Sequence, residues 1–171
     1  MIAAEKLSAQ QLNTYQSFIE KRKDQKQKVT IQDCLLTGSE LKEIEIPEKR
    51  SFLYPIIEEG RIILVIGWRG VGKTWFGLSL VDAITRGYDF GPWTFKNGAP
   101  CLYLDGEMAI QDIKTRYKNL NPKGEQIAPL LFYSDAYANT LGLPRASLLN
   151  RTWREAMKKT LRDYEVKVFI V

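Results

Sequence analysis

The sequence contains no histidine, which excludes several kinds of active site. A Ser-His-Asp triad, a histidine general base and a histidine metal ligand are all ruled out. Cysteine is nearly as scarce, because Cys34 and Cys101 are the only two and lie far apart in the chain. They form no CxxC pair, which excludes a disulfide framework and a cysteine-rich zinc site. We expect both to be reduced thiols with structural roles.

Long apolar runs and targeting signals are also missing. The apolar run 62–66 has the length of a strand and is far shorter than the roughly 18 residues of a membrane span. Residues 1–6 lack the charged and then apolar layout of a signal peptide. The sequence therefore predicts a cytoplasmic protein without a membrane partner.

The bulk composition is that of one ordinary folded domain. The chain has 171 residues, of which 44% are hydrophobic and 26% charged, enough for a sizeable core. The net charge of +5 is compatible with a polyanionic partner such as nucleic acid, and equally with a solvated basic surface. Charge alone does not decide between them.

Residues 1–60 are expected to form an N-terminal helix and a connector packed on the core. The spacing of apolar residues predicts a helix over 8–28, and its basic end at 21–28 is interpreted as an exposed helix terminus rather than a nucleic-acid contact. Residues 29–60 are mixed and punctuated by glycine and proline. The core domain is expected over residues 61–171.

From residue 61 onward, strand and helix patterns alternate. Short β-branched or apolar runs predict strands, and amphipathic stretches between them predict helices. The expected strands are 61–66, 101–104, 130–133 and 166–171, and the expected helices are 73–85, 110–120 and 148–164. Helices between strands imply crossovers and a mainly parallel sheet, so the fold class is α/β with three αβα layers.

A complete phosphate-loop motif, GxxxxGK[ST], lies between the first expected strand and the first helix. Its glycines allow successive N–H groups to face phosphates, and the following helix adds its positive end. Lys73 can reach the β- and γ-phosphates of ATP, and the Thr74 hydroxyl can hold Mg²⁺. The expected nucleotide-binding residues are Gly67, Trp68, Arg69, Gly70, Val71, Gly72, Lys73, Thr74 and Trp75.

The second expected strand ends in acidic residues, Asp105 and Glu107. Carboxyl ends of parallel strands meet at the sheet edge that carries the phosphate loop, so these acids can face the γ-phosphate. A carboxylate there can orient and deprotonate the attacking water, and Glu107 is the candidate base. Asp105 either supports the metal or shapes the turn.

With these residues the chain resembles the RepA-type plasmid helicases among the RecA-like ATPases. The resemblance spans 46–171 and rests on two prolines of the lead-in, on the phosphate loop, and on the segment 103–108. It implies that Glu107 is the catalytic glutamate. It also implies a hexameric ring that couples ATP hydrolysis to movement on single-stranded DNA during plasmid- or phage-type replication.

One departure from this family concerns the fourth strand. Family members carry the Walker B aspartate directly after it, whereas this sequence ends at Val171. We therefore expect an incomplete RecA-like core that stops after the fourth core strand. The sequence does not decide whether this chain by itself hydrolyses ATP.

Two other functions share the phosphate loop. A small-molecule kinase usually carries an arginine-rich lid, and the arginines here are scattered, as at Arg145, Arg151 and Arg154. A nucleotide-binding module without turnover is the second alternative. Trp68, Trp75 and Trp93 are able to stack on a base, although packing is the favoured interpretation for each.

Overall fold

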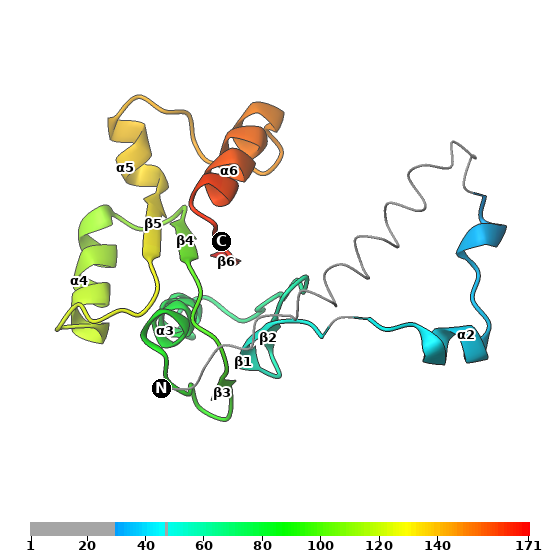
Figure 1. Cartoon of the computed structure of the whole chain (residues 1–171). Coiled ribbons are helices and arrows are strands. Elements are labelled where there is room, and N and C mark those ends of the chain that lie inside the picture. The colour runs from blue at the N-terminus through cyan, green and yellow to red at the C-terminus, as the bar shows by residue number, and fades with distance from the viewer. Residues whose placement is uncertain (1–29, 47) are drawn as a thin grey trace. The chain divides into compact units, whose positions relative to one another are not determined.

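A computed structural model describes residues 30–46 and 48–171 (Figure 1). The chain divides into two compact units, Met1–Glu48 and Lys49–Val171. In the first unit, a 3₁₀ turn, η1 (Gln32–Cys34), precedes α2 (Gly38–Glu43). α2 begins with a capping box, in which the Thr37 hydroxyl accepts from the Glu40 N–H and the Glu40 carboxylate accepts from the Thr37 N–H. The helix predicted over 8–28 lies outside the described residues.

The second unit is built around a three-stranded parallel sheet, as the sequence predicted. β4 (Cys101–Asp105) is central and pairs in parallel with β5 (Leu130–Ser134) and β6 (Val168–Ile170). The strand order is β5-β4-β6. Asp105 pairs in register with Ser134, so the carboxyl ends of β4 and β5 lie side by side.

Four helices connect these elements: α3 (Lys73–Arg86), α4 (Ile110–Leu120), α5 (Asp135–Thr140) and α6 (Arg151–Asp163). α3 ends at Gly87, whose φ of 82° is the left-handed geometry that glycine favours. α6 begins later than predicted because the Asn150 side chain caps it by accepting from the Trp153 N–H. No helix of the described part of the chain is both long and apolar enough to cross a membrane.

The two faces of the sheet bury different residues, which produces the layered α/β fold. Alternate residues of β4 point to opposite faces, so Cys101 and Tyr103 pack toward α3 while Leu102 and Leu104 pack toward α6. Met157 of α6 is buried in the second cluster. Figure 1 shows β4 and β5 between α4 and α6, with α3 beneath the sheet.

A second, antiparallel sheet was not predicted. It consists of β1 (Ser51–Tyr54), β2 (Ile57–Glu58) and β3 (Thr94–Phe95), in the order β2-β1-β3. Phe52 and Leu53 of β1 are almost fully buried and belong to the same core cluster as α3. This small sheet therefore contributes to the core that packs against α3.

The strand predicted at 61–66 does not form. The segment is unpaired and its side chains face water, with Ile62 100%, Leu64 80% and Ile66 84% exposed. A strand needs a neighbour to supply ladder hydrogen bonds, and no described strand pairs with this segment. The β-branched composition predicted a strand here, but whether such a run forms a strand also depends on packing partners.

Candidate nucleotide-binding site

The phosphate loop has the backbone geometry that its glycines permit. Gly70 and Gly72 have φ values of 86° and 96°, a left-handed conformation that other residues rarely adopt. A Cβ on Gly67 would lie 2.9 Å from Val71 Cγ2, so a side chain at this position would force Val71 to shift. α3 starts directly after Gly72, which places the positive end of a 14-residue helix at the loop.

Lys73 lies folded onto the loop that precedes it. Its ammonium donates to the carbonyl oxygens of Gly67 at 2.8 Å and Trp68 at 3.0 Å. Residue 73 is exposed, so the ammonium lies where a dissolved anion can reach it. Two carbonyl oxygens of the phosphate loop therefore hold the Lys73 ammonium against the loop.

The turn after β4 is organised by Asp105. Its Oδ1 accepts from the N–H of Glu107 at 2.9 Å and from the N–H of Met108 at 2.6 Å. Asp105 is 7% exposed, whereas Glu107 is exposed. Asp105 thus shapes the turn that presents the Glu107 carboxylate. Burial raises the pKa of the neighbouring Tyr103 phenol to about 12, and the nearby negative charge of Asp105 adds to this effect.

A polar cavity of about 960 Å³ joins the phosphate loop to this turn. The loop and the start of α3 contribute cations, the turn after β4 contributes a carboxylate, and α5 with its following loop completes the lining. The lining residues are Arg69, Lys73, Gly106, Glu107, Asp135, Ala136, Asn139 and Arg145. Cations able to bind phosphate and an acid able to act on water therefore face one space.

Five lining residues were not predicted as site residues, and three of them, Asp135, Asn139 and Arg145, have polar or charged side chains; the other two are Gly106 and Ala136. A signal for Asp135 was present, because it directly follows β5 in the way that Asp105 ends β4. Because the carboxyl ends of parallel strands lie at one edge of the sheet, an acid that directly follows β5 is expected at the same edge as the turn after β4. Asn139 and Arg145 carry no comparable signal, since their positions depend on the path of the chain after α5.

The three tryptophans considered for base stacking, Trp68, Trp75 and Trp93, differ in their surroundings. Trp68 is 88% exposed on the phosphate loop. Trp75 is 40% exposed, and the Arg116 guanidinium of α4 lies 5.5 Å from its ring centroid. Trp93 packs edge-on against Phe76, with 5.7 Å between the ring centroids. Neither Trp68 nor Trp75 lines the polar cavity.

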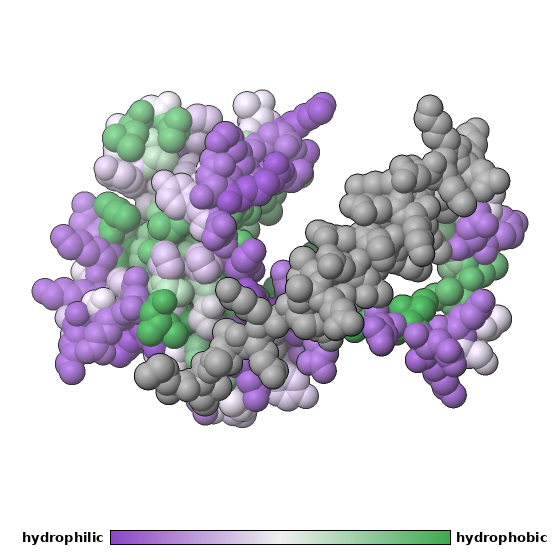
Figure 2. All heavy atoms as spheres, in the orientation of Figure 1, coloured by the Kyte–Doolittle hydropathy of each residue, from purple (hydrophilic) through white to green (hydrophobic). Residues whose placement is uncertain are grey.

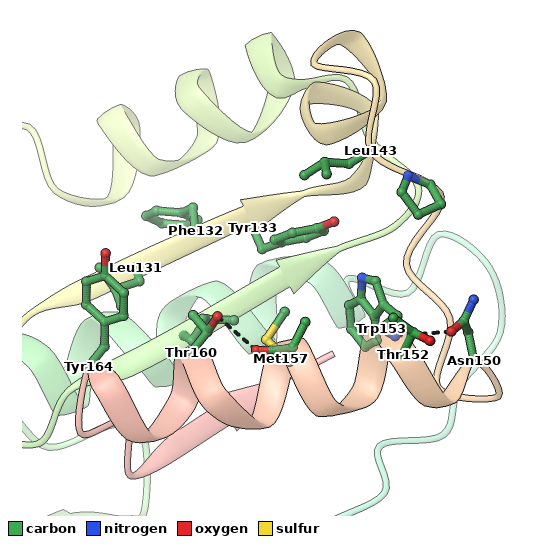
Figure 3. A pocket seen from close by; sticks show the side chains of 13 residues that line it. Leu131, Phe132, Tyr133, Leu143, Asn150, Thr152, Trp153, Met157, Thr160 and Tyr164 are labelled. Carbon is green, nitrogen blue, oxygen red and sulfur yellow. Dashed lines mark hydrogen bonds between the residues drawn. The ribbon is translucent and has the colours of Figure 1, made fainter.

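A second cavity, of about 580 Å³, lies between the sheet and α6 (Figure 3). Its lining is mainly apolar and aromatic, including Leu131, Tyr133, Trp153 and Met157. The Thr160 hydroxyl donates to the Ala156 carbonyl, and Asn150 caps α6, so these polar groups already have partners. No lysine or arginine lines it. The cations and the carboxylate of the predicted site therefore line the polar cavity and not this one.

Comparison with protein families identifies this chain. The model of the AAA domain matches residues 25–171, which includes the phosphate loop, the turn after β4 and every element of the parallel sheet. No curated protein and no solved structure is found to match the sequence. The matched region covers most of the chain, and the chain therefore belongs to the AAA domain family of ATP-binding ATPases.

Proposed function

We propose that this protein hydrolyses ATP in the polar cavity and couples hydrolysis to unwinding of, or movement along, DNA, as RepA-type replicative helicases do. The observation that carries the proposal is the convergence of Lys73 and Glu107 on one cavity. Hydrolysis needs a cation at the transferred phosphate and a group that activates water, and these two residues supply both.

Lys73 binds the β- and γ-phosphates in this proposal. The glycine-rich backbone and the N-terminus of α3 add further hydrogen-bond donors and positive potential at the same place. Glu107 accepts a proton from the attacking water, and Asp105 holds the Glu107 turn in place through two N–H bonds. Arg69 adds a second positive charge from the loop.

The residues present fit a Mg²⁺ ion that enters with ATP. Mg²⁺ prefers oxygen ligands and is commonly held by few protein groups together with substrate phosphates and water. Thr74, the second residue of α3, offers its hydroxyl beside the phosphate loop, and Asp105 at the end of β4 is the acidic candidate. Within the described residues no cluster of three or more acids, cysteines or histidines exists that would bind a metal by itself. Bound Mg²⁺ would neutralise phosphate charge.

Support for a DNA partner comes from α6. One face of this helix packs on the sheet through Met157, and the other faces water with five basic and two acidic residues between 151 and 163. Figure 2 shows this outward surface of α6 as hydrophilic. Glu155 and Asp163 are paired with Lys158 and Lys159, so an excess of arginine remains for phosphate contacts.

The deciding experiment measures phosphate release with and without single-stranded DNA. Wild-type protein is expected to release phosphate from ATP and to respond to DNA, while Glu107→Gln retains ATP binding and loses about 10²-fold or more of the rate. Glu59→Gln, an exposed acid outside the cavity, is the matched control and should match wild type. Transfer of the γ-phosphate to a nucleoside, without a DNA response, would establish the kinase alternative. ATP binding without turnover would establish a binding module.

Assembly into a ring is part of the same proposal. Coupling to DNA movement in helicases of this kind uses six subunits around the strand. Solution mass measured with ATP and DNA present tests this point separately from phosphate release. If the protein is a monomer that still hydrolyses ATP, the proposed ATPase activity stands and the proposed ring is wrong.

A further inference from the structure

We infer that Arg145 binds the terminal phosphate of the nucleotide and so makes the site selective for a triphosphate over a diphosphate. The inference rests on the proposed ATPase function and deepens it. Arg145 follows α5 and lines the polar cavity together with Lys73 and Glu107. It thus adds a third cation from an element separate from the phosphate loop.

The position of Arg145 is fixed by a buried carboxylate. Asp135 is 9% exposed, and its Oδ1 accepts from the N–H of Ala146 at 2.6 Å. A charged acceptor strengthens such a bond, and its burial reduces competition from water. The bond ties the residue after Arg145 to the first residue of α5. Asp135 therefore acts as a positioning residue for Arg145.

The same geometry connects Arg145 to the parallel sheet. Asp135 directly follows β5, and β5 pairs with β4 so that Ser134 lies opposite Asp105. Asp105 in turn holds the turn that bears Glu107. Two neighbouring strand ends thus each use an aspartate to hold a functional segment, one presenting the base and the other presenting a cation.

The Arg145 side chain is available for a ligand. It is exposed, and within residues 30–46 and 48–171 its guanidinium forms no ion pair or hydrogen bond. A guanidinium binds phosphate through two parallel N–H bonds. Asn139 and Asp135 share the lining, so the cation also stays near groups that accept hydrogen bonds. A free guanidinium at a cavity that already holds Lys73 is suited to a multiply charged anion.

The phosphate that Arg145 meets is inferred from the positions of the other cations. Lys73 and the start of α3 belong to the phosphate loop and hold the nucleotide from that side. Arg145 comes from the other side of the lining, formed by α5 and the loop after it, and α5 directly follows β5, the strand beside β4. Because Glu107 acts where the terminal phosphate is attacked, the cation on this wall meets that phosphate.

The test measures affinities for ATP and ADP in the full chain, using fluorescent nucleotide analogues. Arg145→Ala is expected to weaken ATP binding about 10-fold or more, as for loss of a charge-assisted phosphate contact, with ADP affinity changed less than about twofold. Arg145→Lys should recover part of the loss. Arg50→Ala, at an exposed position directly before β1 and outside the cavity, is the matched control and should leave both affinities unchanged.

Asp135 provides a second arm. Asp135→Ala should produce the same ATP-selective loss, while Asp135→Asn, which retains an oxygen acceptor for the Ala146 N–H, should lose less. A general disturbance of folding would weaken ATP and ADP alike, so selectivity separates positioning from structure. Circular dichroism of each variant accompanies the titrations.

Several results would overturn the inference. If Arg145→Ala loses ATP and ADP affinity equally, Arg145 does not contact the terminal phosphate. If both nucleotide affinities are unchanged and DNA binding is weaker, Arg145 contacts the nucleic acid instead. The Lys73→Ala variant distinguishes a failure of this inference from a failure of the proposed ATPase function. If Lys73→Ala loses ATP affinity and Arg145→Ala does not, the ATPase proposal stands and this inference is wrong. If wild type binds no ATP, the proposed function itself fails.

Discussion

The Lys73 ammonium donates a hydrogen bond to the carbonyl oxygen of Gly67 at 2.8 Å. These two residues open and close the turn of the phosphate loop, so the lysine is held by the segment it serves. A phosphate that enters the loop has to replace this carbonyl as the partner of the ammonium. The exchange favours the phosphate because a full negative charge binds a cation more strongly than a neutral carbonyl does.

Replacement of Lys73 by alanine is therefore expected to weaken ATP binding at least about 100-fold, which corresponds to roughly 3 kcal/mol. Isothermal titration against Mg·ATP measures this. Lys118→Ala on α4 is the control, because this lysine lies outside the cavity. Equal affinities for Lys73→Ala and wild type would contradict the assignment of the loop.

Variants of Asp105 distinguish a turn-forming role from a metal-binding one. Asp105→Asn keeps an oxygen that can accept from the Glu107 and Met108 N–H groups, whereas Asp105→Ala keeps none. If the turn is what matters, turnover should fall about 10-fold or more for alanine and clearly less for asparagine, since each lost bond to a charged group costs about 1.5–3 kcal/mol. Steady-state phosphate release is the measurement. Equal losses in both variants would show that the charge, and hence metal binding, is what Asp105 supplies.

Gly77 sets the closeness of α3 to the sheet. A Cβ there would lie 3.2 Å from Tyr103 Cε2 and 3.5 Å from Ile170 Cγ2. Gly77→Val is expected to destabilise the fold by about 1–3 kcal/mol, because added carbon atoms in a packed core force neighbours to shift. Urea unfolding gives the free energy. Gln111→Val, at an exposed position of α4, controls for the cost of a β-branched residue in a helix and should lose much less.

Cys101 predicts how stability depends on alkaline pH. Burial raises the pKa of this thiol from 9.0 to about 12, so the folded chain keeps the proton where the unfolded chain releases it. The unfolding free energy should therefore be unaffected by this group below about pH 9 and should fall as pH rises toward 12. Urea titrations across this range test it. Cys101→Ala removes the ionisation and should show a shallower decline; an identical slope would exclude the thiol as its source.

Binding of single-stranded DNA, if α6 contacts it, should weaken steeply as salt increases. Each phosphate neutralised on a single strand contributes roughly 0.7 to the slope of log affinity against log salt. The double variant Arg151→Ala/Arg162→Ala should lower that slope by about 1 and leave ATP affinity unchanged. Fluorescence anisotropy of labelled oligonucleotides measures it. A slope unaffected by the double variant would place the DNA contact elsewhere.

The parts of the fold that the sequence predicted well are those with strong local signals. The glycine pattern before Lys73 and Gly87 at the end of α3 bracket the helix, and the apolar run of β4 ends at an acid. Both Lys73 and Glu107 line the polar cavity. Local chemistry was sufficient for this much because caps and loops depend on few neighbours.

The remainder depended on distant contacts that no local pattern encodes. β1 is only four residues long, and its pairing with β3 joins segments about 40 residues apart, which a short alternating run does not reveal. Arg145 reaches the cavity because Asp135 holds the Ala146 N–H, a bond across 11 positions. The run 61–66 shows the opposite error, since its composition predicted a buried strand and no described strand pairs with it.

That exposed run continues directly into Gly67, which gives it a thermodynamic consequence. A molecule that pairs with the segment or covers its apolar side chains has to restrict the backbone that leads into the phosphate loop. If nucleotide binding favours one arrangement of that backbone, the two events share a coupling free energy, and each ligand changes the affinity of the other by the same factor. Under that condition, a ligand of the hydrophobic run 61–66 would change the affinity for the nucleotide without entering the cavity.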